Sequence, residues 1–181
     1  MNRFCVKTIF PPNYLKNEID QKKTIRLFLA GSIEQGKAEE WQKRIINFLI
    51  NFKDGSDSSI KEEEKTTLVV FNPRRPDWNP GLPQDVLNAK LKEQIMWELK
   101  YLDESDIICL YLDPKTTSPV SLLELGLHIK TGKLLVCCPP GFYRKANIDL
   151  TCNKYGVNVY EDYDTLCTQL TEKILCEIRK Q

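Results

Sequence analysis

The sequence lacks the features that mark secreted, membrane-spanning or nucleic-acid-binding proteins. Its formal net charge is only +1, which leaves no strong field to recruit nucleic acid or anionic lipid. No apolar run approaches the roughly 20 residues that span a bilayer, and the segment from Met1 to Pro12 has no secretory apolar region. We therefore expect neither a nucleic-acid partner nor a membrane partner.

The cysteines and the single histidine give no sign of a disulfide framework or a metal site. The seven cysteines are odd in number, form no CxxC pair and lie partly in apolar runs. This usage is typical of reduced packing residues in a cytoplasmic protein. His128 is the only histidine, and no spacing of potential ligands indicates zinc.

Continuous apolar runs alternate with segments of helical periodicity along most of the chain. Such runs are typical of parallel strands that are buried on both faces. The order predicts an α/β fold, with a parallel sheet of about five strands and helices on both faces. We expect a single domain over residues 24–181, and an N-terminal extension over residues 1–23 with a possible edge strand at Val6–Phe10. Strands are expected over Thr24–Ala30, Thr67–Asn72, Ile107–Leu112, Leu134–Cys138 and Val157–Tyr160, and helices over Ala38–Phe52, Ala89–Asp103, Pro119–Thr131, Ala146–Lys154 and Asp162–Arg179.

The loops that follow the predicted strands are the candidate ligand sites, because parallel sheets bind ligands beyond the carboxyl ends of their strands. The first strand runs into Gly31 and Ser32, where backbone N–H groups suit an anion or a sugar hydroxyl. An ordinary strand-to-helix turn explains the same residues. The second strand enters a proline-rich loop with two arginines, Asp77 and Trp78. A ring and a carboxylate there suit a nucleobase, and a surface loop pinned by Trp78 suits the pattern equally well.

One carboxylate lies in unusually apolar company. Glu124 is flanked by leucines in the helix expected after the third strand, and a carboxylate in such surroundings is either paired or functional. Ser121 and His128 share its helix face, so hydrogen bonds from them are an alternative to a catalytic role. Glu98, in the preceding helix, has the spacing of an ordinary solvated carboxylate. Ser118, followed by a proline, predicts an N-cap for the helix of Glu124.

Five segments together resemble the nucleoside 2-deoxyribosyltransferase-like family. The resemblance covers about Ile25 to Tyr160 and implies a flavodoxin-like (Rossmann-like) fold, homo-oligomers such as dimers or hexamers, and small-molecule nucleoside and nucleobase partners. The matching segments are FLAGSIEQGKAEEW (Phe28–Trp41), FNPRRPDW (Phe71–Trp78), EQIMWELKYLDESDIICLYL (Glu93–Leu112), SPVSLLELGLH (Ser118–His128) and CCPPGFYRKANID (Cys137–Asp149).

The resemblance implies roles for individual residues. Glu124 matches the family's carboxylate nucleophile, and Glu98 matches an aspartate that handles protons or orients that nucleophile. Phe28 stands where many relatives carry a tyrosine that touches the nucleophile. Glu34 stands where a basic residue would favour phosphate, which favours unphosphorylated nucleosides, while Lys37 in the same turn leaves the phosphate requirement open. Asn147 matches a residue that acts across a subunit interface. Substrate contacts are implied for Phe28, Gly31, Ser32, Asp77, Trp78, Ser118 and Asn147.

The chemistry implied is that of a retaining glycosidase acting on an N-glycoside. Glu124 attacks C1′ while Asp77 or Glu98 assists the departing base, and a second base or water then attacks the ester. This reaction requires no metal or organic cofactor. The alternatives are hydrolysis of nucleosides or nucleoside 5′-monophosphates, and a non-catalytic nucleotide-sensing module.

Overall fold

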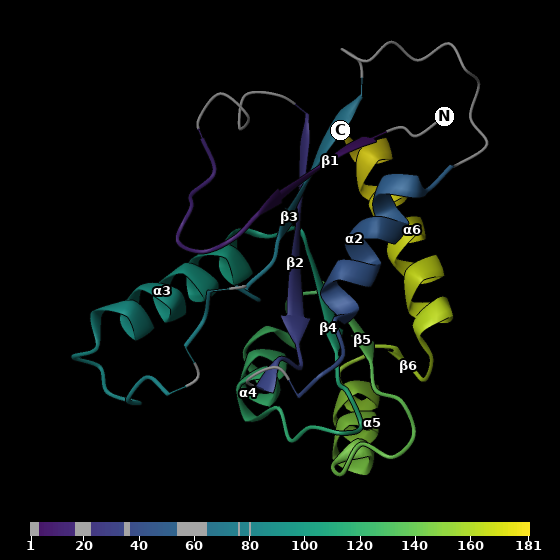
Figure 1. The fold of residues 1–181 in the computed structure, drawn as a ribbon. Helices are drawn as coiled ribbons and strands as arrows, with labels where there is room; N and C mark the ends of the chain where they lie inside the picture. Colours follow the sequence, from purple (N-terminus) through teal and green to yellow (C-terminus); the bar gives the residue numbers. More distant parts are fainter. Residues whose placement is uncertain (1–3, 17–22, 35–36, 54–64, 76, 80) are drawn as a thin grey trace.

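The protein has a parallel sheet of six strands with helices on both faces, seen in the computed structural model (Figure 1). The structure describes residues 4–16, 23–34, 37–53, 65–75, 77–79 and 81–181. In these ranges the strands are β1 (Phe4–Ile9), β2 (Thr24–Gly31), β3 (Thr66–Phe71), β4 (Ile107–Tyr111), β5 (Leu134–Cys137) and β6 (Val159–Tyr160). The helices are α2 (Trp41–Asn51), α3 (Ala89–Glu104), α4 (Pro119–His128), α5 (Lys145–Lys154) and α6 (Tyr163–Lys180).

Two apolar layers enclose the sheet, which explains why its strands read as continuous apolar runs. Along β2, Phe28 and Ala30 face the layer formed with α3, α4 and α5. Leu27 and Leu29 face the opposite layer, formed with α2 and α6, which lie side by side in Figure 1. The α/β architecture with helices on both faces is therefore confirmed.

The sheet has one strand more than the expected five. The additional strand is β1, which confirms the possible edge strand expected at Val6–Phe10 but begins two residues earlier and ends one residue earlier. It pairs in parallel with β3 from Phe4 opposite Thr66 to Ile9 opposite Phe71. It forms one edge of the sheet, whose order is β1-β3-β2-β4-β5-β6. Residues ahead of the first predicted strand thus extend the sheet, next to the strand that carries the proline-rich loop.

Two helices are shorter than predicted by three residues or more. The helix expected from Ala38 begins at Trp41, because the carbonyls of Ala38 and Glu39 accept hydrogen bonds from Arg74 instead. The helix expected to reach Thr131 ends at His128, where the hydroxyl of Thr131 donates to the His128 carbonyl at 2.7 Å. Among the described residues, no helix has the length and apolar character needed to cross a membrane.

The strand order changes direction at β2, so the ligand crevice expected for such a sheet is the region between the loops after β2 and β4. These strands approach each other very closely at their carboxyl ends. Gly31 has a φ of +127°, and a Cβ atom there would lie 2.1 Å from the Tyr111 carbonyl oxygen. The next residue, Ser32, donates its N–H to the same oxygen at 2.9 Å. Only glycine fits this position, so Gly31 brings the two loops together.

Candidate functional site

Two glutamates from neighbouring helices form a buried carboxylate pair. Glu124 on α4 is only 9% exposed, and Glu98 on α3 is partly buried. Burial, with a smaller contribution from the charge of Glu98, raises the pKa of Glu124 to about 8. Burial also raises the pKa of Glu98 to about 7, although a hydrogen bond opposes that shift. Burial therefore favours the protonated form of both carboxyls.

The hydrogen bond on Glu98 comes from the buried side chain of Gln94, one turn earlier on α3. Its Nε2 donates to Glu98 Oε1 at 2.8 Å and to the Pro73 carbonyl at 3.0 Å. Gln94 thus joins the carboxylate pair to the loop after β3. Both N–H groups of the Gln94 amide are thus used as donors, whereas its Oε1 is buried and has no partner among the described residues.

Glu124 has no comparable support from its own helix. Ser121 and His128 are buried on the same side of α4, but within the described residues neither donates a hydrogen bond to the Glu124 carboxylate, and its raised pKa has no hydrogen-bond contribution. Burial lowers the pKa of His128, which disfavours a cation there. The alternative in which these residues hold Glu124 by hydrogen bonds is therefore not seen.

Three buried hydroxyl groups connect the loops at the crevice. The Oγ atoms of Ser32 and Ser118 lie 2.6 Å apart, and Thr116 Oγ1 lies 2.8 Å from Ser32 and 2.7 Å from Ser118. Ser118 is the N-cap residue of α4 and Pro119 is the first helical residue, as predicted, but Ser118 has a φ of 45° and its side chain makes no cap hydrogen bond. The Ser118 hydroxyl instead bonds to the hydroxyls of Ser32 and Thr116, which take the place of the helix N–H groups as its partners.

A third carboxylate, Glu34, is fully engaged at the same crevice. It accepts hydrogen bonds from the Thr117 N–H at 2.6 Å, the Thr117 hydroxyl at 3.0 Å and the Ser118 N–H at 3.3 Å. Burial acts to raise the pKa of Glu34, but these bonds outweigh it and leave the pKa lowered. The Glu34 carboxylate thus already accepts from the N–H groups of Thr117 and Ser118, which precede α4.

The loop after β3 holds the predicted base-binding residues, Asp77 and Trp78. Asp77 is exposed and pairs with Arg75 at 2.8 Å, and the Arg75 hydrogen bond lowers the pKa of the Asp77 carboxyl. The ion pair therefore favours the ionised form of Asp77, which has no proton to donate to a departing base. Trp78 is partly buried and lines a cavity of about 890 Å³ together with Asp77.

The two remaining predicted residues are one core residue and one surface residue. Phe28 is fully buried and packs in the core with its ring 6.0 Å from that of Trp97, which gives it a structural role. Asn147 is exposed on α5 and lines a groove against Leu122 of α4. Contact of either residue with a substrate stays a prediction.

Gln94, Thr116 and the segment after β1 are features that the sequence reading missed. Gln94 precedes Glu98 by four residues, a spacing that places both on one helix face and was a usable signal. Thr116 and the segment after β1 had no such signal, because their partners are distant in sequence. In the described parts of the chain, no group of three or more His, Cys, Asp or Glu side chains could hold a metal ion.

Comparison with known proteins gives one family match. The family is described as nucleoside 2-deoxyribosyltransferase like, and its model matches residues 24–142. The match includes Gly31, Glu98 and Glu124, begins after β1 and ends before Asn147. A search of the curated proteins found no match to the chain.

Proposed function

Since the chain belongs to the nucleoside 2-deoxyribosyltransferase-like family, we propose that it cleaves the N-glycosidic bond of 2′-deoxynucleosides and transfers the sugar to a second base. The observation that carries this proposal is the pair of Glu98 and Glu124, two buried carboxyls with raised pKa values. Burying such groups without a cation is unfavourable for folding, which supports a catalytic use.

In the first step, Glu124 acts as the nucleophile in its ionised form. Its oxygen forms a bond to C1′ while the C1′–N bond breaks, and the electron pair of that bond leaves with the base. The reactive form of the pair has Glu124 ionised and Glu98 protonated, and the proton of Glu98 moves to the departing nitrogen. The ionised carboxylate also stabilises the positive charge that develops on the sugar, and a sugar without a 2′-hydroxyl develops that charge more readily.

In the second step, a nitrogen of another base attacks C1′ and the ester bond breaks, which returns the electron pair to Glu124. The proton of the incoming nitrogen passes to Glu98, so the pair regains its original state. Glu98 suits both proton transfers because its pKa is about 7, near the pH at which it must give and take a proton. Asp77 is less suitable because its ion pair with Arg75 favours the ionised form.

The substrate is proposed to be an unphosphorylated nucleoside. Glu34 fills the N–H donors of Thr117 and Ser118 with a carboxylate, and a 5′-phosphate at the crevice would meet this negative charge. Hydrolysis follows from the same mechanism when water replaces the second base, so the acceptor decides between transfer and hydrolysis.

The test is chromatography of the purified protein incubated with 2′-deoxyinosine, with and without adenine. Formation of deoxyadenosine supports transfer, and hypoxanthine without deoxyadenosine supports hydrolysis. Release of base from a deoxynucleoside monophosphate, but not from the nucleoside, contradicts the proposed substrate. Binding of these compounds without any turnover supports the sensing module instead.

We further propose a homo-oligomer that uses the outer face of α4. Val120, Leu123 and Leu127 are spaced along one side of this helix and are 61%, 62% and 57% exposed. Replacing Leu123 with glutamate is expected to lower the mass measured by analytical ultracentrifugation. Ile50→Glu, at an exposed position on α2, is the matched control and should leave the mass unchanged. A wild-type protein that sediments as a monomer contradicts this proposal.

A further inference from the structure

The amide of Gln94 combines two engaged N–H groups with an unused oxygen, all in a buried position on α3. The N–H groups donate to Glu98 Oε1 at 2.8 Å and to the Pro73 carbonyl at 3.0 Å. The amide oxygen, Oε1, is buried and has no partner among the described residues. A buried acceptor without a donor is unfavourable, so a second state of the site in which this oxygen accepts a hydrogen bond would recover the loss.

The observed orientation of the Gln94 amide suits an ionised Glu98. A carboxylate only accepts hydrogen bonds, and its charge strengthens the bond that an N–H group donates to it. A protonated Glu98 instead carries an O–H group that needs an acceptor. The Gln94 Oε1 atom, which has no donor in the described part of the chain, belongs to the same amide that contacts Glu98. The reversed orientation of the amide therefore suits the acid, although its bond is the weaker of the two.

The two orientations have different consequences for the start of the loop after β3. When the amide reverses, its oxygen takes the place of Nε2 and faces the Pro73 carbonyl, which is also only an acceptor. The Pro73 carbonyl then loses the donor that it has in the observed orientation. This carbonyl and the Arg74 N–H belong to one planar peptide group, and that N–H donates to Asn72 Oδ1 at 3.0 Å. Reversal of the Gln94 amide therefore loosens the peptide group with which the loop begins.

Glu98 changes its charge in an accessible pH range. Burial raises its pKa to about 7, although the Gln94 hydrogen bond opposes that shift. The carboxyl is therefore protonated at pH 5.5 and ionised at pH 8.5. Glu124 on α4 is the ionisable group whose charge interacts with that of Glu98, and no other described charged group shifts the pKa of Glu98.

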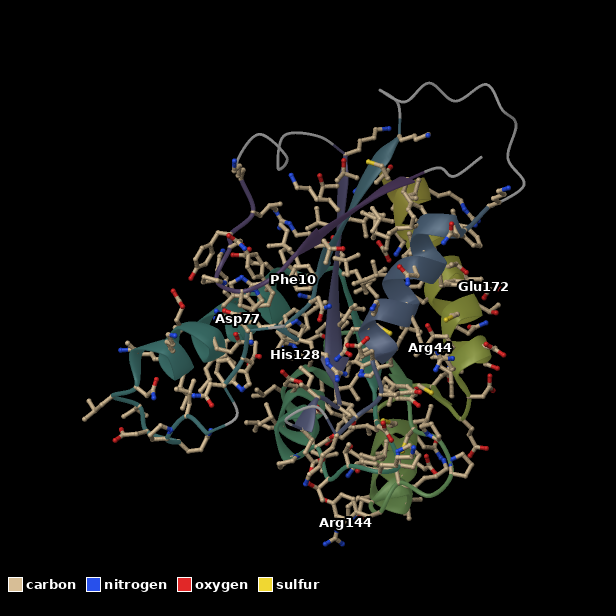
Figure 2. All side chains as sticks on the ribbon, viewed as in Figure 1. Phe10, Arg44, Asp77, His128, Arg144 and Glu172 are labelled. Carbon is tan, nitrogen blue, oxygen red and sulfur yellow. The ribbon has the colours of Figure 1, made fainter. Side chains whose placement is uncertain are left out.

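The outer part of the loop after β3 has contacts with α3 that do not depend on Gln94. Figure 2 shows Asp77 beside this helix, where Lys90 attracts it. Arg75 is attracted in turn by Glu93. Arg75 and Asp77 also pair with each other at 2.8 Å, and their hydrogen bond lowers the pKa of Asp77 and raises that of Arg75. Both therefore stay charged near neutral pH, so the effect of Gln94 is confined to the start of the loop.

We propose that Gln94 is a positioning residue that couples the loop after β3 to the protonation of Glu98. Its amide holds the Pro73 carbonyl while Glu98 is ionised, and turns over to accept the Glu98 O–H when the acid forms. The coupling itself needs no reaction, and its part in turnover rests on the proposed function. There, transfer of the Glu98 proton to the departing base fixes the loop while the sugar is bound to Glu124. Return of the proton then loosens the loop for product release.

The test is hydrogen exchange of the Arg74 amide in the purified protein, followed by NMR spectroscopy between pH 5.5 and pH 8.5. Each exchange rate is compared with that of an unprotected peptide at the same pH, which removes the intrinsic effect of pH on exchange. We expect the protection of Arg74 in the wild type to rise about tenfold with pH. The midpoint of this rise should lie near pH 7, where Glu98 ionises.

Two variants separate this coupling from simple packing. Gln94→Met keeps the length of the side chain but removes its donor and its acceptor, so the protection of Arg74 should be low and independent of pH. Gln169→Met, on the distant helix α6, is the matched control and should reproduce the wild-type profile. If Gln94→Met fails to fold, Glu98→Met carries the test, because a side chain that cannot ionise should also make the protection of Arg74 independent of pH.

The outcomes distinguish this inference from the proposed reaction. The coupling is overturned if the protection of Arg74 in the wild type does not change with pH, or if its pH dependence persists in folded Gln94→Met. Turnover of 2′-deoxynucleosides together with either result leaves the reaction standing. A pH-dependent protection that disappears in Gln94→Met, in a protein without turnover, supports the coupling and overturns the reaction.

Discussion

Two carboxylates near α4 have opposite environments. Glu34 accepts three hydrogen bonds ahead of the helix, and its pKa is lowered. Glu124, inside the helix, receives none from the described residues, and its pKa is raised to about 8. The first group stabilises the ionised state and joins two loops. The second is held at a cost to folding, which is typical of groups that act in catalysis.

The largest effect expected from this contrast is on turnover. Glu124→Gln removes the nucleophile, because an amide cannot form the ester, and should slow turnover at least about 10³-fold. Glu34→Gln, which leaves the carboxylate pair intact, should slow it less than tenfold. Release of base from 2′-deoxyinosine measures both variants. Near-normal turnover of Glu124→Gln would show that Glu124 is not the nucleophile.

The second effect is on stability and depends on pH. The pKa of Glu124 rises from 4.5 to about 8 on folding, so ionisation favours the unfolded chain and stability falls as the pH increases through this window. Glu124→Gln removes this penalty. Relative to the wild type, the variant should gain about 2–4 kcal/mol in the free energy of unfolding between pH 4.5 and pH 9.

Urea unfolding at both pH values measures this gain. Leu150→Gln, at an exposed position on α5, is the control and should show no such pH dependence. A Glu124→Gln variant that gains nothing at pH 9 would indicate that the carboxylate is well solvated, which would also weaken its assignment as a buried nucleophile.

The third effect has the opposite sign. Glu34 has a lowered pKa, so its contribution to stability is present above the unfolded value near 4.5 and is lost as the pH falls through the folded pKa. At pH 7, Glu34→Gln should therefore destabilise the fold by about 1 kcal/mol, because the amide accepts fewer hydrogen bonds. The same urea series measures it. Equal stability of the variant and the wild type at pH 7 would remove the loop-joining role from Glu34.

The sequence predicted the fold and the carboxylate pair for different reasons. The central strands were recognisable because residues buried on both faces leave continuous apolar runs. The edge strand β1 reads Phe-Cys-Val-Lys-Thr-Ile and is only partly apolar, so the sequence indicated it only as a possible strand at Val6–Phe10. Glu124 was recognisable from its apolar neighbours and from the family resemblance. The raised pKa of Glu98 was not, because its helix spacing resembles that of a solvated residue.

Local sequence patterns could not predict the hydrogen-bond network around the site. Ser118 has the sequence context of an N-cap, but its hydroxyl bonds to Ser32, which is 86 residues away. Gln94 has a local signal toward Glu98, yet its anchor at the Pro73 carbonyl depends on how α3 packs against the loop after β3. Local propensity describes a helix end in isolation, and tertiary partners then decide which bonds form.

The smallest predicted effect concerns the Gln94 hydrogen bond, which Glu98 receives and Glu124 does not. Gln94 donates to Glu98 and so opposes the rise of its pKa. Gln94→Met removes the donor, and the pKa of Glu98 should rise further. The proposed reaction needs Glu98 protonated and Glu124 ionised. The alkaline limb of the pH profile of turnover therefore reports the loss of the last proton from the two carboxyls. That limb should move to higher pH, with turnover at the optimum reduced less than tenfold.

The pH dependence of turnover separates this positioning role from a merely structural one. Loss of packing alone would lower turnover at every pH and leave the alkaline limb in place, as would a change in the amount of folded protein. Gln169→Met, which removes an amide from α6, serves as the control and should leave the limb unchanged. An unmoved limb in folded Gln94→Met would mean that Gln94 holds the loop after β3 but does not influence the proton, and the two carboxylates would then owe their properties to burial and to each other.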